Sequence, residues 1–135
     1  MERTVKFNIV VMFLLALCSP FAWAMSDCAQ GANDTEVLNC STANKAQAEE
    51  SLNKAYAQAK KRIASSYQAA PETNKAYQQV LLDSQLGWLK YRDGQCKIEA
   101  YLVENASNVS LDLANQCITR LDLERIKQLQ AIPYE

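Results

Sequence analysis

Four cysteines constrain the fold of this chain more than any other feature: Cys28, Cys40, Cys96 and Cys117. An even number of cysteines in a small exported domain is most simply explained by two disulfides. Of the three possible pairings we favour Cys28–Cys40 and Cys96–Cys117, because each joins neighbours in the sequence and closes a short loop. Loops of roughly a dozen and roughly twenty residues would each contribute on the order of 3 kcal/mol to stability.

A metal site is the competing use of these cysteines. They lack CxxC spacing, however, and the chain has no histidine to complete a ligand set. We therefore expect no metal and no cofactor.

The N-terminus has the three parts of a secretory signal peptide. A basic start is followed by an apolar run from Phe7 to Leu17, and Ala22-Trp23-Ala24 is a small-x-small cleavage signal. Residues 1–24 are thus expected to be removed, leaving one domain of residues 25–135 in the periplasm, on the working view that the source is bacterial. The apolar run is too short for an integral membrane span.

An alternative for the N-terminus is a lipid anchor. Leu15-Ala16-Leu17-Cys18 resembles a lipoprotein box, in which Cys18 would carry the lipid. Leu17 occupies a position where a small residue is expected, so we favour cleavage after Ala24 and loss of Cys18 with the signal peptide.

The charge of the mature part excludes some classes of function. Of the 14 basic and 15 acidic residues of the chain, Arg3, Lys6 and Glu2 leave with the signal peptide, so 12 and 14 remain, a net charge of −2. Such a balance would not neutralise a row of phosphates, so no nucleic-acid partner is expected. The chain also has no histidine base, no glycine-rich phosphate loop and no recognisable nucleophile. An enzyme is therefore not expected.

Helical periodicity dominates the mature chain. The first helix is expected from about Thr35 to Tyr67, with Asp34 or Thr35 as its N-cap. The inward stripe that this spacing predicts consists of Leu38, Ala48, Leu52, Ala55, Tyr56, Ala59, Ile63 and Tyr67.

A second helix should begin near Pro71, because proline is tolerated at the first helical position. Its expected seam is Tyr77, Leu81, Ser84, Trp88, Tyr91, Gln95, Ile98 and Leu102. The extra apolar residues Val80, Leu82, Leu86 and Leu89 indicate a central helix that touches two neighbours. Gly87 would then mark a close approach by another backbone.

A polar loop, Glu104–Ser110, separates this helix from a third one, Leu111 to about Ala131, with Ser110 or Asn108 as the N-cap. Its inward residues are expected to be Leu111, Ala114, Ile118, Leu121 and Leu129. Short connections between three long helices predict an all-α fold, an up-down-up antiparallel three-helix bundle stapled by two disulfides.

The string Trp88-Leu-Lys90-Tyr91-Arg92-Asp93-Gly-Gln-Cys96 concentrates the unusual residues of the chain. In a structural interpretation the two aromatic side chains fill the core, while Arg92 and Asp93 pair with polar groups on adjacent helices. In a functional interpretation Arg92 and Asp93 form part of a partner site. The sequence leaves both open.

This string, together with the upstream Cys40 and the pattern Ala48…Leu52-Asn53-x-x-Tyr56, resembles the bacterial LprI-type lysozyme-inhibitor family. The resemblance spans roughly Asp27 to Leu129, with Leu52, Tyr56, Trp88 and Tyr91 as its structural motif residues. It implies a periplasmic or surface-anchored helical domain with two disulfides that inhibits host or competitor lysozymes. Gly87 departs from the pattern, since alanine is expected there.

A lysozyme inhibitor is the leading hypothesis for function. Lysozymes are usually basic and cleave with carboxylates, so an inhibitor can offer acidic groups to the rim and a protruding loop to the cleft. The candidate segments are Glu104–Ser110, with Glu104, Asn105 and Asn108, and Gly31–Glu36. Alternatively Lys90 or Arg92, beside Asp93, would reach a catalytic carboxylate.

Two other functions remain open at this point. The chain could be a periplasmic immunity protein against one delivered toxin, or a structural envelope or stress-related protein without a tight enzyme partner.

Overall fold

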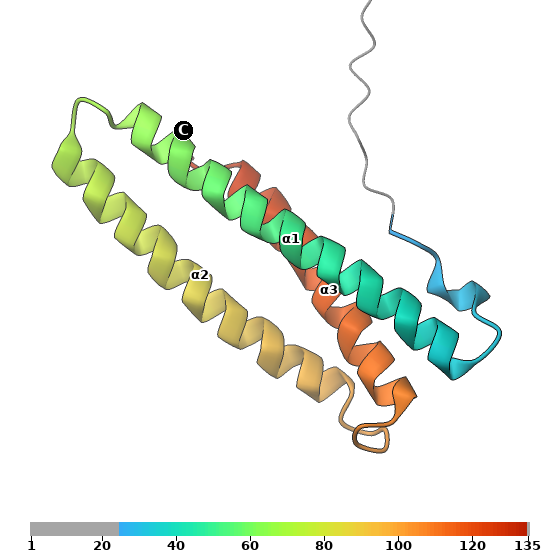
Figure 1. Cartoon of the computed structure of the whole chain (residues 1–135). Helices are drawn as coiled ribbons and strands as arrows, with labels where there is room; N and C mark the ends of the chain where they lie inside the picture. Colours follow the sequence, from blue (N-terminus) through green and yellow to red (C-terminus); the bar gives the residue numbers. More distant parts are fainter. Residues whose placement is uncertain (1–24, 135) are drawn as a thin grey trace, which may run out of the picture.

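The computed structural model describes residues 25–134, which form three long helices and a short 3₁₀ helix. The 3₁₀ helix η1 spans Cys28–Gln30, and the α-helices are α1 (Asp34–Ser66), α2 (Pro71–Glu99) and α3 (Asn108–Gln130). The α-helices run up, down and up, as predicted (Figure 1). The predicted signal peptide and Cys18 lie outside the described residues. Within residues 25–134, no helix combines the length and the apolar character needed to cross a membrane.

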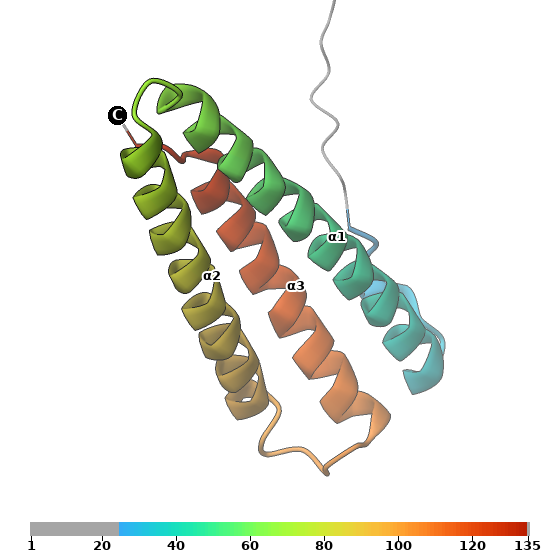
Figure 2. The same cartoon turned by 60° about the vertical axis from the view of Figure 1, so that its left-hand side comes forward.

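The third helix, not the second, is the central one. Figure 2 shows α3 between α1 and α2, and α1 and α2 contact each other least. Alanines at 48, 55 and 59 line the buried side of α1, and their small side chains let α3 approach closely. The prediction that α2 lies between two neighbours is therefore wrong.

The predicted stripe of α1 forms most of the core. Its middle and C-terminal part is buried, with Ala48, Leu52, Ala55, Ala59 and Ile63 each at most 4% exposed. Leu81 of α2 and Leu129 at the end of α3 close this cluster, and Tyr56, Tyr67 and Trp88 pack against it. Burial of this amphipathic face is the main stabilisation that such a helix has.

Much of the apolar surface predicted to be inward on α2 faces solvent instead. Since α3 is the main neighbour of α2, only part of its circumference is covered. The residues concerned are exposed by 40–69%: Val80, Leu82, Leu86, Tyr91 and Ile98. Leu102 lies beyond the end of the helix and is 96% exposed, and Leu111 of α3 is 46% exposed.

The expected close approach at Gly87 is also wrong. A Cβ atom built on Gly87 would meet nothing within 4 Å.

Two helix caps lie one residue or more before their predicted positions. Asn33, not Asp34 or Thr35, caps α1: its Oδ1 accepts from the amide of Glu36 at 3.0 Å. The carboxylate of Glu36 in turn accepts from Asn33 Nδ2 and from the amide of Ala32. Ser107 caps α3 by accepting from the amide of Ser110, so Asn108 and Ser110 already belong to the first turn. Each cap satisfies a free amide of the first turn.

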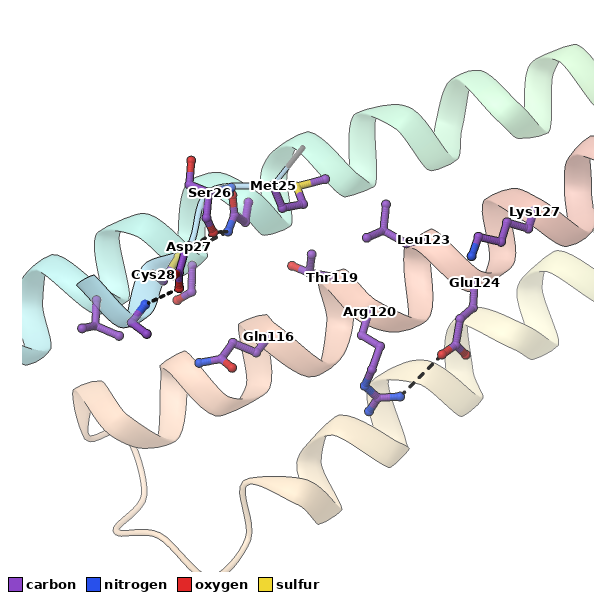
Figure 3. A pocket seen from close by; sticks show the side chains of 14 residues that line it. Met25, Ser26, Asp27, Cys28, Gln116, Thr119, Arg120, Leu123, Glu124 and Lys127 are labelled. Carbon is purple, nitrogen blue, oxygen red and sulfur yellow. Dashed lines mark hydrogen bonds and ion pairs between the residues drawn. The ribbon is translucent and has the colours of Figure 1, made fainter. Parts of the chain in front are cut away.

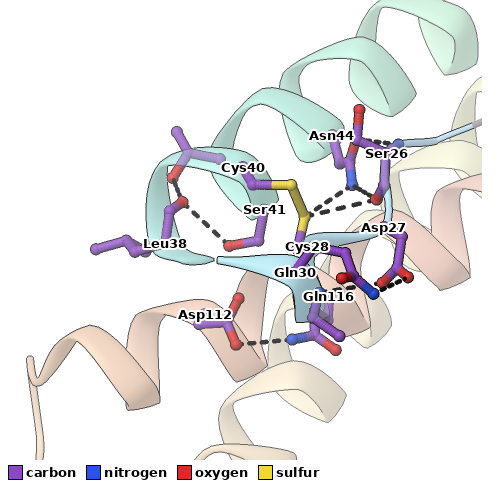
Figure 4. The surroundings of a disulfide bond; sticks show 12 residues. Ser26, Asp27, Cys28, Gln30, Leu38, Cys40, Ser41, Asn44, Asp112 and Gln116 are labelled. Atoms are coloured by element: carbon purple, nitrogen blue, oxygen red, sulfur yellow. Dashed lines mark hydrogen bonds between the residues drawn. A yellow bond between two sulfur atoms is a disulfide. The ribbon is translucent and has the colours of Figure 1, made fainter. Parts of the chain in front are cut away.

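Both predicted disulfides are confirmed. Cys28–Cys40 joins η1 to α1, and Cys96–Cys117 joins α2 to α3, each with Cα atoms 5.5 Å apart. Around the first disulfide, Asn44 donates from Nδ2 to the carbonyl of Ser26 at 2.9 Å (Figure 4). These contacts hold the N-terminal segment against α1.

Candidate functional site

The arginine of the Trp-x-x-Tyr-Arg-Asp string lies inside the bundle. Arg92 is 8% exposed, and its Nη1 donates to Asp122 Oδ1 at 2.9 Å. Its Nε and Nη2 donate to Asp93 Oδ1 at 2.9 and 2.8 Å. The structural interpretation holds for Arg92, which ties α2 to α3, and for Trp88, which packs against the core. It is wrong for Tyr91, which is 58% exposed, and for Asp93, whose partner is Arg92 on the same helix.

A second buried arginine flanks the same tryptophan. The guanidinium carbons of Arg92 and Arg125 each lie 5.7 Å from the ring centre of Trp88, within reach of a cation–π attraction. Arg125 donates to neutral oxygens only, those of Gln85, Ser84 and Gln128. Burial lowers the pKa of Arg125, because the hydrogen bonds bring no compensating negative charge.

Asp122 is the carboxylate at the centre of this cluster. It is 0% exposed, and its Oδ2 has no hydrogen-bond partner in the described part of the chain. Burial raises the pKa of the Asp122 carboxyl, although the hydrogen bond from Arg92 acts to lower it. For Arg92, burial lowers the pKa, but its hydrogen bonds to Asp122 and Asp93 outweigh this effect and the pKa is raised.

The sequence motif contains Arg92 and Trp88, but it does not indicate Arg125, Gln85 or the role of Asp122. A signal was present, because Asp122 and Arg125 fall within the inward stripe of α3, between Leu121 and Leu129. Charged residues are rarely buried unless they are paired, so their place in this stripe indicates buried polar partners.

The remaining motif residues are divided between the core and the surface. Leu52 is buried and Tyr56 half-buried in the core, whereas Tyr91 points outward and is 58% exposed. Lys90 and Asp93 are exposed along α2. Among residues 25–134, no group of three or more His, Cys, Asp or Glu side chains could hold a metal ion.

The two segments predicted as insertion loops meet at one end of the bundle. Asn108 donates from Nδ2 to Thr35 Oγ1 at 3.3 Å, which connects the start of α3 to the start of α1. Two turns further along, Asn115 donates to Thr42 Oγ1 at 3.1 Å. Figures 1 and 2 both place the α2–α3 loop at the same end of the bundle as the N-terminal end of α1. Asn108 thus contacts the segment of residues 31–36, and Glu104 and Asn105 lie at the same end of the bundle. Lys90, Arg92 and Asp93 lie apart from them, on α2.

This end of the bundle carries negative charge without neighbouring positive charge in the sequence. Residues 26–44 and residues 98–119 contain no lysine and no arginine. Their acidic residues are Asp27, Asp34, Glu36, Glu99, Glu104 and Asp112. We call the surface formed by these two segments the acidic end. One of its carboxylates is neutralised, since Glu99 accepts from Arg120 at 2.8 Å.

Large apolar side chains project from the same end. Tyr101 is 78% and Leu102 is 96% exposed, in the loop directly after α2. Turn hydrogen bonds from Val103 to Ala100 and from Ser107 to Glu104 shape the loop, and the disulfide between α2 and α3 closes its base. A loop held in this way can present apolar side chains to a partner with little loss of conformational entropy.

Ala106, also in this loop, has a φ of 60°. This left-handed conformation costs a non-glycine residue about 1 kcal/mol or more. Strain of this kind tends to occur in binding loops.

A surface groove of about 590 Å³ runs beside the acidic end (Figure 3). The N-terminal segment with Met25 and Asp27 forms one wall, and the α3 residues Gln116, Leu123 and Lys127 form the other. Arg120 and Glu124 lie 3.9 Å apart on its rim. Because its charges are mixed, the groove by itself points to no ligand class.

Three comparisons with known proteins bear on this site. The family model described as "Lysozyme inhibitor LprI" matches residues 25–129. A crystal structure of a DUF1311 family protein from Pseudomonas putida KT2440 is similar to this chain, with a TM-score of 0.68 and 21% sequence identity. The similarity covers 81% of this chain and 99% of that chain, and at this identity it shows the fold alone. No match was found among curated proteins.

Proposed function

The chain belongs to the lysozyme inhibitor LprI family, and from this premise we propose that it acts outside the cytoplasm as a protein inhibitor that binds a lysozyme with its acidic end. The family is one of inhibitors, so the function is binding and not catalysis. The two disulfides support an oxidising compartment, the periplasm in a bacterium.

The acidic end is the observation that carries this proposal. A lysozyme with a positively charged surface would be attracted to this end of the bundle, where two neighbouring segments carry six carboxylates and no cations. Complementary charge speeds the encounter and fixes the orientation of two proteins more than it adds affinity.

Affinity would come mainly from Tyr101 and Leu102. A few desolvated side chains near the centre of an interface, tyrosine prominent among them, carry most of its binding energy, and burial of an apolar neighbour adds to it. Both residues project from a loop whose base is held by a disulfide, which suits insertion into a cleft. Inhibition would follow from blocking access of peptidoglycan to the cleft.

Titration of the oxidised mature protein into a turbidity assay of lysozyme activity tests this proposal. We expect inhibition at a stoichiometric dose for at least one basic lysozyme in a panel of different classes. No inhibition by a large excess, with any member of the panel, would contradict it. That outcome is what the immunity-protein and structural alternatives predict.

Variants of the loop test the proposed surface. Tyr101→Ala combined with Leu102→Ala should raise the inhibition constant about 100-fold, since two central apolar contacts are lost. Tyr134→Ala is the matched control, because Tyr134 is also 66% exposed but lies near the C-terminus, at the other end of the bundle. Equal inhibition by the loop variant and the control would move the binding site elsewhere.

Neutralising the acidic end tests the electrostatic part of the proposal. Asp34→Asn with Glu104→Gln should lower the association rate several-fold at low ionic strength and weaken its salt dependence. Glu72→Gln, at the start of α2 and thus at the opposite end, is the control and should leave the rate unchanged.

A further inference from the structure

The outward face of α2 carries a stripe of uncharged residues, with one gap between Val80 and Gly87, where Ser84 accepts from Arg125 of α3. It consists of Val80, Gly87, Tyr91, Gly94 and Ile98, all exposed, and we call it the outer stripe of α2. Val80, Tyr91 and Ile98 are 64%, 58% and 69% exposed. The steps between its members are seven, four, three and four residues, which is the repeat of a seam between two coiled helices.

The fold of the single chain does not account for this stripe. A Cβ atom on Gly87 or Gly94 would meet nothing within 4 Å, so neither glycine makes room for another part of the molecule. Each glycine within a helix costs about 1 kcal/mol relative to alanine. Three large apolar side chains are left in water beside them, along a helix of 29 residues.

The charges that border the stripe indicate what could cover it. Asp83, Lys90 and Lys97 follow one flank of α2 at intervals of seven residues. When two identical helices pack antiparallel, the same flank of each helix meets the same flank of the other. Asp83 in the N-terminal half therefore faces the lysines of the C-terminal half, and the flank is complementary to itself at this position.

The pairing with a two-fold axis at Gly87 satisfies all of these features. Each Asp83 then lies opposite Lys90 of the second copy, and Val80 lies opposite Gly94 of the second copy. Gly87 meets its own counterpart at the crossing point, where the absence of side chains lets the backbones come close. In this register almost the whole length of α2 is paired.

We propose that the protein forms a symmetric dimer in which the outer stripes of α2 from two copies pack antiparallel. The interface is isologous, as in most homodimers. Because the two helices run in opposite directions, the acidic ends of the two copies point away from each other and both stay accessible. This inference goes beyond the proposed function and does not depend on it.

Measurement of the molar mass of the oxidised mature protein as a function of concentration, by sedimentation equilibrium without any lysozyme, tests the dimer. We expect a transition from monomer to dimer, and Ile98→Glu should raise the dissociation constant at least 100-fold. Leu86→Glu is the matched control, since Leu86 is 57% exposed on the same helix but lies off the stripe. A monomer up to millimolar concentration, or a dimer that survives Ile98→Glu, overturns the proposal.

A charge exchange tests the register. Asp83→Lys should weaken the dimer about tenfold, because a lysine then faces Lys90 of the second copy. Adding Lys90→Asp restores the opposite charges and should recover the original dissociation constant. Circular dichroism of each variant establishes that the helices are intact. Failure of the second substitution to recover dimerisation overturns the antiparallel register.

Discussion

Asp122 is a charged residue in the core whose burial is only partly compensated by hydrogen bonds. One oxygen accepts from Arg92, whereas the other, equally buried, has no partner among the described residues. Taking a carboxylate out of water costs several kcal/mol, and one ion pair offsets only part of that cost. Burial accordingly raises the pKa of the Asp122 carboxyl above its ordinary value of 3.8.

This shift gives a pH dependence with a definite sign. Since the folded-state pKa of Asp122 is raised, the unfolded chain gives up this proton first as the pH rises above 3.8. The contribution of Asp122 to stability is therefore greatest below that pH and falls until the folded carboxyl has also ionised. We expect the difference in free energy of unfolding between the wild type and Asp122→Asn to decrease from pH 3 to neutral pH, measured by urea denaturation.

Glu99 provides a control with the opposite sign. Hydrogen bonds from Gln95 and Arg120 lower the pKa of its carboxyl, so its contribution is present above the ordinary value of 4.5 and is lost as the pH falls. The difference between the wild type and Glu99→Gln should therefore increase with pH. If the free-energy differences for the two variants changed with pH in the same direction, the raised pKa of Asp122 would be contradicted.

At the scale of the helices, α2 is the one with an incomplete N-terminus. Ala70 occupies its N-cap position and makes no side-chain hydrogen bond, whereas Asn33 and Ser107 cap the other two α-helices. Proline at position 71 removes one free amide, but those of the next residues have no side-chain acceptor at the cap.

Replacing this residue should stabilise the protein. Ala70→Asp supplies an acceptor for the first-turn amides and a negative charge at the positive end of the helix dipole. We expect the free energy of unfolding to rise by about 1 kcal/mol, measured as a higher urea midpoint with an unchanged m-value. Ala69→Asp places the same charge one residue before the cap and should have a much smaller effect. Equal gains would mean that charge alone acts.

The helices themselves were predictable, but the number of neighbours that each one has was not. Pro71 and the apolar spacing located α2, and the stripe of α1 from Ala48 to Ile63 is buried as predicted. Periodicity shows which side of a helix can be buried, but it does not show how much of that side a neighbour covers. For this reason Val80 and Ile98, predicted to be inward, are exposed.

Only part of the candidate site could be predicted from the sequence. Its polar residues, such as Glu104, lie in a polar segment that the sequence indicates as a loop. Leu102 does not, because its spacing continues the apolar pattern of α2 beyond Glu99, where the helix ends. Tyr101 and Leu102 become recognisable as surface residues only once that end is known. The contact between Asn108 and Thr35 depends on the topology of the whole bundle.

Across the whole molecule, the two ends of the bundle are held together by different means. The larger apolar cluster, with Ile63, Leu81 and Leu129, lies toward the end where α1 finishes and α2 begins. There Arg62 also donates to the carbonyls of Leu129 and Ile132 at 2.6 and 2.7 Å, which satisfies the last turn of α3. The acidic end has the smaller cluster, built around Cys96, Cys117 and Leu121, and both disulfides lie toward it.

Removal of one disulfide should therefore weaken the acidic end more than the rest. The Cys96–Cys117 bridge closes a loop of 21 residues, so Cys96→Ser with Cys117→Ser should lower the free energy of unfolding by about 3 kcal/mol. Amide hydrogen exchange should accelerate first in the last turns of α2 and the first turns of α3, while the amides around Ile63 keep their protection, because local opening follows local packing.

The same variant connects the architecture to the proposed function. If Tyr101 and Leu102 bind by being held in place, loosening the base of their loop should weaken lysozyme inhibition about tenfold even at temperatures where the variant is fully folded. The matched comparison is Cys28→Ser with Cys40→Ser, which removes a bridge of similar entropic value without freeing this loop. Equal losses of inhibition in the two variants would indicate that global stability, and not the fixed shape of the α2–α3 loop, limits binding.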